Sequence, residues 1–219
     1  MTDKASADLR NLVVFRADAS DRIGGGHVMR CLVLAGSLAM SGWRCAFASR
    51  PETFPAVSLL SVSGHELVEI SCGQEDEPEF LTGRWPGGCG ILVVDHFDRG
   101  AEFESACRSW AGRIMAIEDV PNRKHECDIM FDHTPNRTNE DYAGLLSPHC
   151  RTLLGPDFAL LRPQFAKARA KALLRRRRET AGCRVFIGVG AVDDKNMTTV
   201  ALQGIAKAGV DVEVDVVIG

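Results

Sequence analysis

The sequence predicts an α/β protein in which helices cover both faces of a parallel sheet. Two observations carry this prediction. Short apolar runs, which are typical of buried strands, alternate along the chain with longer segments of helical periodicity. The runs themselves are strongly apolar, as expected for strands that have no solvated face.

The first part of the chain carries most of these elements. A glycine-rich turn precedes a helix over residues 27–40 that ends at Ser41-Gly42, and a second helix covers 102–111 with Gly112 as its stop. The acidic cluster Glu75-Asp-Glu-Pro-Glu79 indicates a solvated loop. The predicted strands are 12–15, 45–48, 67–70, 91–94, 114–117, 129–131 and 152–154.

The later part of the chain begins with a basic helix. Pro163 is placed like a first helical residue, the helix runs to about Arg178, and nine Lys or Arg residues fall between 162 and 184. One further β-α-β unit follows, which is too small to build a core of its own. Either residues 185–219 add to another sheet, or the chain is a fragment or naturally short. We therefore expect an N-terminal domain over 1–160, a basic linker helix over 161–182 and the start of an incomplete domain over 183–219.

Composition excludes several classes of protein. The 26 basic and 29 acidic side chains give a net charge of −3, and no apolar run approaches the roughly 18–20 residues of a membrane span. The first residues carry no signal peptide, so we expect a cytoplasmic protein. No two of the eight cysteines are spaced C-x-x-C, which argues against a zinc site. The run Arg175–Arg178 has no interleaved aromatic residues, which favours a solvated helix end over nucleic-acid binding.

The segment Ile23-Gly-Gly-Gly-His-Val-Met-Arg30 is the most informative feature of the sequence. Gly24, Gly25 and Gly26 let the backbone approach a ligand, and a helix N-terminus offers free N–H groups to an anion such as a diphosphate. His27 and Arg30 share one face of an otherwise apolar helix, and an imidazole suits general-base work on a water molecule. The alternative is that His27 only caps the turn and Arg30 pairs with a local carboxylate.

Polar residues follow four of the predicted strands. Ligands of parallel-sheet proteins bind at the carboxyl ends of the strands, so these residues are candidates for ligand contact. Taken singly, each such position is more often a cap or turn former. No set of side chains has convincing metal-ligand spacing, and we expect His65, His125 and His149 at the surface or in loops. The strand-end residues are Asp18, Asp95-His96, Glu118-Asp119 and Asp132-His133.

Four stretches, in this order and at these separations, carry a family resemblance. They are Arg16-Ala-Asp-Ala-Ser with Ile23–Leu32, Val93–Phe97, Ile117–Asp128 and Leu153–Phe165. Together they resemble the UDP-2,4-diacetamido-2,4,6-trideoxy-β-L-altropyranose hydrolases of pseudaminic acid biosynthesis, over roughly residues 12–200. The glycine turn with its histidine also resembles lipid-linked sugar transferases of similar fold.

The resemblance implies a glycosyltransferase-B-like architecture of two Rossmann-like domains, the second of which binds nucleotide and is incomplete in this chain. It implies attack of water at the anomeric carbon, inversion, release of UDP, a role in flagellin glycosylation, and neither cofactor nor metal. His27 is then the general base, which agrees with the reading of the glycine turn, because a diphosphate is a good leaving group. The implied substrate-binding residues are Arg16, Asp18, Gly24, Gly25, Gly26, Arg30, Asp95, Asp119, Arg162 and Asn196.

The chain departs from the family pattern at three places. Phe97 and Phe158 stand where the family usually has tyrosine, and the turn Gly190–Asn196 lacks the usual second glycine and hydroxyl. Two alternatives to the hydrolase therefore stay open. One is a glycosyltransferase that passes the sugar to an acceptor, and the other is a truncated, non-catalytic protein that binds nucleotide-sugar.

Overall fold

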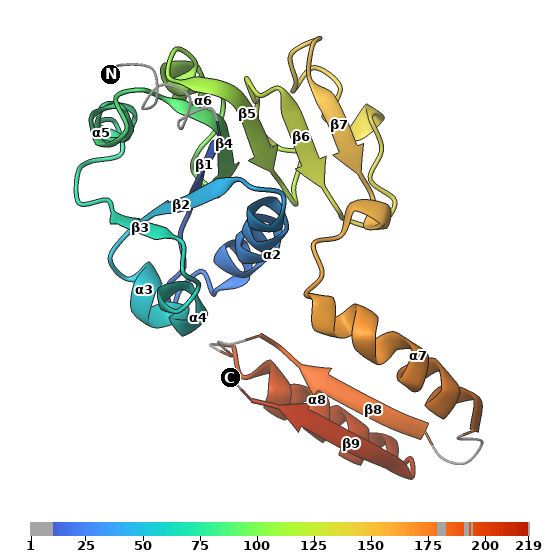
Figure 1. Ribbon diagram of the computed structural model, residues 1–219. Helices are drawn as coiled ribbons and strands as arrows, with labels where there is room; N and C mark the ends of the chain where they lie inside the picture. Colours follow the sequence, from blue (N-terminus) through green and yellow to red (C-terminus); the bar gives the residue numbers. More distant parts are fainter. Residues whose placement is uncertain (1–10, 179–182, 191–192, 194, 219) are drawn as a thin grey trace. The chain divides into compact units, whose positions relative to one another are not determined.

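The computed structural model of the protein describes residues 11–178, 183–190, 193 and 195–218 (Figure 1). The chain divides into two compact units, one made of residues 1–20 and 25–160 and the other of residues 21–24 and 161–219. Three residues of the turn that departs from the family pattern, Ala191, Val192 and Asp194, lie outside the described residues.

A parallel sheet forms the centre of the first unit. Within the described residues its seven strands lie in the order β3-β2-β1-β4-β5-β6-β7, and all neighbouring strands run parallel, as the sequence predicts. The strands are β1 (Leu12–Ala17), β2 (Arg44–Ser49), β3 (Glu66–Glu69), β4 (Cys89–Asp95), β5 (Ala111–Ile117), β6 (Ile129–Asp132) and β7 (Arg151–Leu154). The helices are α2 (Gly26–Met40), α3 (Thr53–Ala56), α4 (Ser58–Ser61), α5 (Glu77–Arg84) and α6 (Ala101–Cys107), with 3-10 turns η1 (Glu140–Tyr142) and η2 (Pro156–Phe158).

The strand order reverses between β1 and β4. From β1 the chain moves to β2 and β3, and it then returns to the other side of β1 as β4, where Ala17 pairs with Asp95. Loops that leave two such strands turn to opposite sides, and ligands of parallel α/β proteins bind in the crevice between them. The glycine turn follows β1 and Asp95 ends β4, so both lie at this crevice.

Separate apolar clusters pack against the two faces of the sheet. Successive residues of a strand point to opposite faces. Val13 and Phe15 therefore pack in the cluster that includes α2, whereas Leu12 and Val14 pack in the cluster that includes α5 and α6. Five of the cysteines are buried in these clusters, which confirms their interpretation as small hydrophobic residues. They are Cys31, Cys45, Cys89, Cys107 and Cys127.

Two tryptophans fix the connection from α5 to β4. The ring centroids of Trp85 and Trp110 lie 6.3 Å apart, and Nε1 of Trp110 donates a hydrogen bond of 2.8 Å to the carbonyl oxygen of Trp85. Gly88 closes the turn with a φ of 84° and donates its N–H to the same carbonyl oxygen at 2.9 Å. The turn therefore depends on the backbone carbonyl of Trp85 and on the indole N–H of Trp110.

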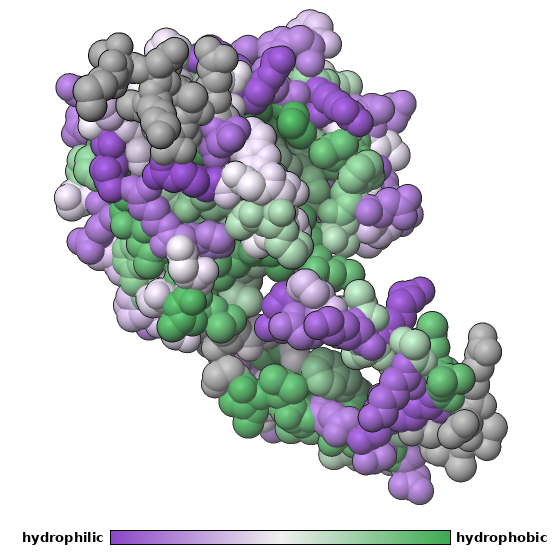
Figure 2. All heavy atoms as spheres, viewed as in Figure 1, coloured by the Kyte–Doolittle hydropathy of each residue, from purple (hydrophilic) through white to green (hydrophobic). Residues whose placement is uncertain are grey.

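The second unit contains a basic helix and one β-α-β element. The helix α7 (Pro163–Arg178) begins at the predicted proline, and Figure 2 shows hydrophilic residues gathered over it. The strands β8 (Cys183–Gly188) and β9 (Val212–Val217) run parallel, with α8 (Met197–Ala208) between them in the chain. Among the described residues of this unit, Ile187 is the one buried apolar side chain. No helix in the described part of the chain is long and apolar enough to cross a membrane.

Two local predictions are wrong. The helix predicted over 102–111 ends at Cys107, and Gly112 lies inside β5 instead of stopping a helix. A Cβ atom at Gly112 would lie 2.9 Å from the carbonyl oxygen of Gly90, so the glycine permits close approach of two strands. The acidic cluster is not a solvated loop, because Glu77 begins α5 and is fully buried against arginines.

Candidate functional site

The turn between β1 and α2 leaves backbone donors without intrahelical partners. Gly24 has a φ of 73°, in the left-handed region that favours glycine. Gly25 precedes α2 with no side-chain cap, and a Cβ atom there would lie 2.9 Å from Cγ2 of Val57. The first bond of the helix runs from the N–H of Met29 to the carbonyl oxygen of Gly25 at 3.0 Å. The N–H groups that precede it, those of residues 26–28, are suited to an anion.

His27 forms a short contact with the acid that ends β4. Its Nδ1 lies 2.5 Å from Oδ1 of Asp95, and the carboxylate of Asp95 is fully buried. Burial alone would raise the pKa of Asp95, but hydrogen bonds from Arg30 and His27 hold it below its ordinary value. An ionised carboxylate only accepts hydrogen bonds, so Nδ1 carries a proton, and the neutral tautomer of this ring is the one with its lone pair on Nε2. Nε2 has no hydrogen-bond partner among the described residues.

Arg30 joins the ends of two neighbouring strands. Its Nε and Nη2 bind the two oxygens of Asp95 at 2.5 and 2.6 Å, and its Nη1 binds Oδ1 of Asp119 at 2.6 Å. Burial would lower the pKa of Arg30, but the hydrogen bonds to both acids raise it above its ordinary value. The structure thus brings together His27, Arg30, Asp95 and Asp119, four residues that the sequence singles out. The pairing of Arg30 is with acids 65 and 89 residues away, not with a local carboxylate.

The imidazole of His27 lies at the boundary between the core and solvent. The residue is 8% exposed, and its ring meets Phe97 edge to face at a centroid distance of 4.4 Å. Phe97 is itself 51% exposed, on the loop that follows β4. The ring of His27 therefore borders an aromatic side chain at the surface and is not enclosed by hydrocarbon on all sides.

Arg16 and Asp18 belong to a separate buried network. Arg16 is fully buried, and its guanidinium binds Glu77 (Nε to Oε2, 2.9 Å) and Asp18 (Nη1 to Oδ1, 2.7 Å). Against the cost of burial, these and other hydrogen bonds lower the pKa of Glu77 to about 2 and that of Asp18 below its ordinary value. Contact of Arg16 or Asp18 with a substrate stays a prediction. The further partners of the network are Arg50, Arg99 and His96.

His125 is buried, contrary to the prediction of a surface or loop histidine. Its Nδ1 lies 2.7 Å from Oε1 of Glu104 and its Nε2 lies 3.2 Å from Oε1 of Glu118. Although burial opposes the charge, hydrogen bonds to the two carboxylates raise the pKa of His125 to about 9. The ion cluster fixes the segment that follows β5 and carries Asp119. The other two histidines of that prediction, His65 and His149, are partly buried and exposed, respectively.

Asp132, the acid at the end of β6, forms hydrogen bonds with neighbouring residues of the fold. Asp132 is fully buried, accepts a hydrogen bond of 2.8 Å from Oη of Tyr142 and binds Nε of Arg137 at 2.5 Å. It also accepts the N–H of Thr134 at 2.9 Å, which is a turn-forming contact. The interpretation as a turn former therefore holds at this strand end.

Sequence reasoning missed several charged residues near the site. Glu77 lies in an acidic run that resembles a solvated loop, so composition alone hides its burial. Arg99 and Arg123 follow β4 and β5 by a few residues, and Arg123 lies within one of the stretches that carry the family resemblance. Its place within a matched stretch is the sequence signal for Arg123.

Two predicted site residues, Arg162 and Asn196, lie after residue 160 in the second unit. Arg162 is exposed, and its guanidinium lies 5.6 Å from the ring centroid of Phe165. Asn196 precedes α8 with a φ of 52°, and the N–H groups of Met197 and Thr198 bind the carboxylate of Asp193. Their contact with a substrate stays a prediction, as does that of the three glycines.

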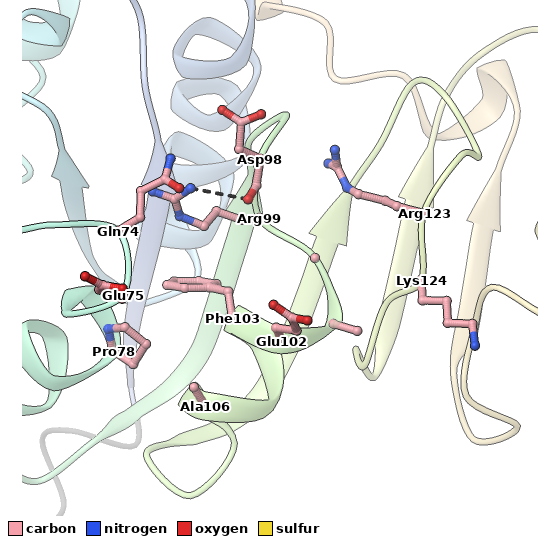
Figure 3. A pocket seen from close by; sticks show the side chains of 12 residues that line it. Gln74, Glu75, Pro78, Asp98, Arg99, Glu102, Phe103, Ala106, Arg123 and Lys124 are labelled. Carbon is pink, nitrogen blue, oxygen red and sulfur yellow. Dashed lines mark hydrogen bonds between the residues drawn. The ribbon is translucent and has the colours of Figure 1, made fainter.

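A groove of about 930 Å³ opens beside the loop that follows β4 (Figure 3). Phe103 and Arg99 lie on its floor, with the guanidinium 5.7 Å from the ring centroid. Its walls carry charges of both signs, including Glu102 and Arg123 (Figure 3). The residues of the glycine-turn site do not line this groove. In the described part of the chain, no group of three or more His, Cys, Asp or Glu side chains is arranged to hold a metal ion.

Comparison with known proteins finds similarity to a curated enzyme sequence and to solved structures. The chain is 27% identical over 191 residues to the UDP-2,4-diacetamido-2,4,6-trideoxy-β-L-altropyranose hydrolase of Campylobacter jejuni, a match that covers 85% of this chain and 62% of that protein. This chain therefore spans less than two thirds of the length of that hydrolase. No protein-family model matches it.

One of the similar solved structures is the crystal structure of Acinetobacter baumannii MurG. It matches with a TM-score of 0.58 at 12% sequence identity, over 94% of this chain and 59% of that chain. At this identity the likeness concerns the fold alone. The chain thus has the α/β, glycosyltransferase-B-like fold that the sequence predicts, and it is similar in sequence to a UDP-sugar hydrolase.

Proposed function

We propose that the protein hydrolyses a UDP-linked diacetamido-trideoxy sugar, releasing UDP and the free sugar for pseudaminic acid biosynthesis. One observation carries the proposal. The imidazole of His27 is held at 2.5 Å by the buried carboxylate of Asp95, directly beside the uncapped N-terminus of α2. A candidate base and an anion site thus adjoin each other at the strand-order reversal. The similarity to the C. jejuni hydrolase supports the substrate class.

The proposed reaction uses Nε2 of His27 as a general base. Nε2 takes a proton from water while the water oxygen bonds to the anomeric carbon, and the bond from that carbon to the diphosphate oxygen breaks. The electron pair of this bond leaves with UDP, and the configuration of the anomeric carbon inverts. Asp95 keeps the proton on Nδ1 and stabilises the imidazolium that forms.

The proposed diphosphate site is the N-terminus of α2. The backbone N–H groups of residues 26–28 and the positive end of the helix dipole stabilise the charge that develops on the leaving group. Asp119 is suited to the sugar, because its side chain is 41% exposed and Oδ1 alone holds Arg30. The other carboxylate oxygen, Oδ2, can accept hydrogen bonds from hydroxyl or acetamido groups.

The test is UDP release from the altropyranose substrate, measured for the wild type and for His27→Ala. We expect the substitution to lower kcat by about 10²–10⁴-fold, the usual contribution of a general base. His149→Ala removes an exposed histidine and is the matched control, with kcat unchanged. Equal rates for the wild type and His27→Ala would reject the base assignment.

The same assay in ¹⁸O-labelled water identifies the bond that breaks. Attack at the anomeric carbon puts the label in the sugar hydroxyl, whereas attack at phosphorus puts it in UDP. Turnover that requires an added acceptor alcohol would instead identify a glycosyltransferase. Binding of UDP without turnover in either assay would identify a nucleotide-sugar-binding protein.

A further inference from the structure

We propose that Arg123 is a positioning residue for the catalytic base, acting on His27 through Phe97. The inference rests on the proposed function, since it concerns the residue assigned there as the base. The inference adds to the proposed function a role for Arg123, a side chain outside the glycine turn and outside the strand ends.

The guanidinium of Arg123 binds backbone carbonyl groups of the loop that follows β4. Its Nη1 donates to the carbonyl oxygen of Phe97, and its Nη2 donates to the carbonyl oxygen of His96 at 2.6 Å. Nη2 also binds Oε1 of Glu118. One guanidinium therefore fixes two successive peptide groups of this loop to a carboxylate that follows β5. The planar fork of arginine suits such divergent acceptors better than the single ammonium of lysine.

The position of the Phe97 ring depends on that backbone. Phe97 is 51% exposed, so the core does not enclose its ring. The ring of Phe97 contacts the imidazole of His27 edge to face, with the two ring centroids 4.4 Å apart and an interplanar angle of 89°. If the peptide groups of residues 96 and 97 move, the aromatic ring moves with them, and the imidazole loses the neighbour that limits its rotation about the bond to Asp95.

Glu118, the carboxylate that Arg123 binds, is itself held in the core. Glu118 is 5% exposed and also meets Nε2 of His125 at 3.2 Å, while Nδ1 of that histidine binds Glu104 at 2.7 Å. A second connection runs from the same strand end through Asp119 and Arg30 to Asp95. His27 is thus held on two sides, on the carboxylate side by Arg30 and on the ring side by Arg123.

The expected cost of losing this support is catalytic. A misplacement of about 1 Å at a catalytic group lowers the rate by about 10²-fold. We therefore expect Arg123→Ala to lower kcat by about 10–100-fold and to leave KM within about twofold, because Arg123 does not border the glycine turn that is proposed to bind the diphosphate. Arg123→Lys restores one of the donors and recovers part of kcat, and guanidinium ion in the assay recovers part of the kcat of Arg123→Ala.

Arg108→Ala is the matched control. Arg108 binds the segment between β5 and β6 that also carries Arg123, through the carbonyl oxygen of Glu126 and through Oδ2 of Asp128 at 2.5 Å, but these bonds do not involve residue 96 or residue 97. We expect its kcat to stay within about threefold of the wild type and to show no response to guanidinium. Both variants are compared for thermal unfolding, so that a loss of stability common to the two is separated from an effect on kcat.

A double-mutant cycle with Phe97→Ala tests the route of the effect. If Arg123 acts through Phe97, the losses in kcat are not additive, and Arg123→Ala has little further effect in Phe97→Ala. Additive losses, or a wild-type kcat in Arg123→Ala, would overturn the proposal.

An NMR measurement separates this proposal from the proposed function. The ring protons of His27, assigned by comparison with His27→Ala, feel the ring current of Phe97. We expect their shifts to change in Arg123→Ala and Phe97→Ala and to stay unchanged in Arg108→Ala. Unchanged shifts in Arg123→Ala would overturn the positioning role even in an active enzyme. A wild type that releases no UDP would overturn the proposed function while the shifts still decide the role of Arg123.

Discussion

Two neighbours compete for Nδ1 of His27, and their chemistry decides where its proton lies. Nη2 of Arg30 lies 3.3 Å away and can only donate, whereas Oδ1 of Asp95 lies 2.5 Å away and can only accept. The shorter contact to the buried carboxylate requires a proton on Nδ1. Arg30 then serves Asp95, keeping the carboxylate ionised so that the imidazole stays in one tautomer.

This geometry predicts the effect of Asp95→Asn. An amide can donate to Nδ1 as well as accept from it, so the histidine is free to carry its proton on Nε2, where it cannot act as a base. We expect kcat for UDP release to fall by about 10²–10⁴-fold, as in other histidines that lose an orienting carboxylate.

Asp132→Asn is the control for this change. Asp132 is likewise a fully buried acid at a strand end, but its partners are Tyr142 and Arg137, so kcat should change far less. If both substitutions lower kcat equally, the loss reflects damage to the sheet edge and not the tautomer of His27.

The sequence predicts the members of the site better than their contacts. Helical spacing puts His27 and Arg30 on one face, and the strand-end rule puts Asp95 and Asp119 at one edge of the sheet. Which acid meets which base depends on strand order, which the sequence pattern does not contain. The burial of Glu77 and His125 was not predicted for a similar reason, because each is neutralised by partners that are distant in the chain.

The connection between α5 and β4 shows how one backbone position constrains two elements. Gly88 has a φ of 84°, and a Cβ atom there would lie 2.5 Å from the carbonyl oxygen of Trp110. Neither the backbone conformation nor the space admits a side chain. The turn can be changed only by moving α5, β4 or the segment before β5.

Gly88→Ala is therefore expected to destabilise the protein by roughly 1–3 kcal/mol, since it adds a clash to a left-handed conformation. Gly83→Ala is the matched control within α5, where a Cβ atom meets nothing within 4 Å. In a helix this change stabilises by up to about 1 kcal/mol. Urea unfolding of the two variants should give free-energy changes of opposite sign, and a stable Gly88→Ala would contradict the turn.

The ion cluster of His125, Glu104 and Glu118 predicts a loss of stability at alkaline pH. The carboxylates of Glu104 and Glu118 raise the pKa of His125 to about 9, above the value of about 6.5 for an unfolded histidine. The contribution of the imidazolium is complete below pH about 6.5 and is lost as the pH rises through about 9. We expect the free energy of unfolding to fall over this range, and His125→Gln to remove that part of the slope. An unchanged slope in the variant would contradict the assignment.

Strands were easier to predict than helices in this chain. The predicted strands are present because each is marked by a short apolar run, which in β1, β2 and β5 is buried on both faces of the sheet. Apolar periodicity marks α2 in the same way. The helix α5 has no such signal, since acids and a proline fill its first turn. The end of α6 was missed because Gly112 resembles a helix stop, whereas its role in β5 depends on the neighbouring strand.

At the scale of the whole molecule, the two units differ in how much they bury. The first has apolar clusters on both faces of its sheet, whereas Ile187 is the one buried apolar side chain among the described residues of the second. Exposed apolar residues in the second unit include Phe186, Val200 and Ile218. The fold class was predictable from the alternation of strands and helices, but the proposed domain boundaries stay a prediction.

Hydrogen exchange should reveal this difference. Amide protons exchange fastest where few buried apolar contacts oppose local opening. We expect the backbone amides of β8 and β9 to exchange faster than those of β1 and β4, by on the order of tenfold or more. Similar protection of the two sheets, measured by mass spectrometry on the intact chain, would contradict the expectation.

The position of Trp85 and Trp110 has a practical consequence. Together with Trp43 they are all the tryptophans of the chain, and the one tyrosine is Tyr142, so every strong ultraviolet chromophore precedes residue 161. Intrinsic fluorescence and near-ultraviolet dichroism therefore report on the larger sheet and stay silent about α7, β8, α8 and β9. A melting curve recorded by emission alone would look like a single transition even if the C-terminal segment had already opened.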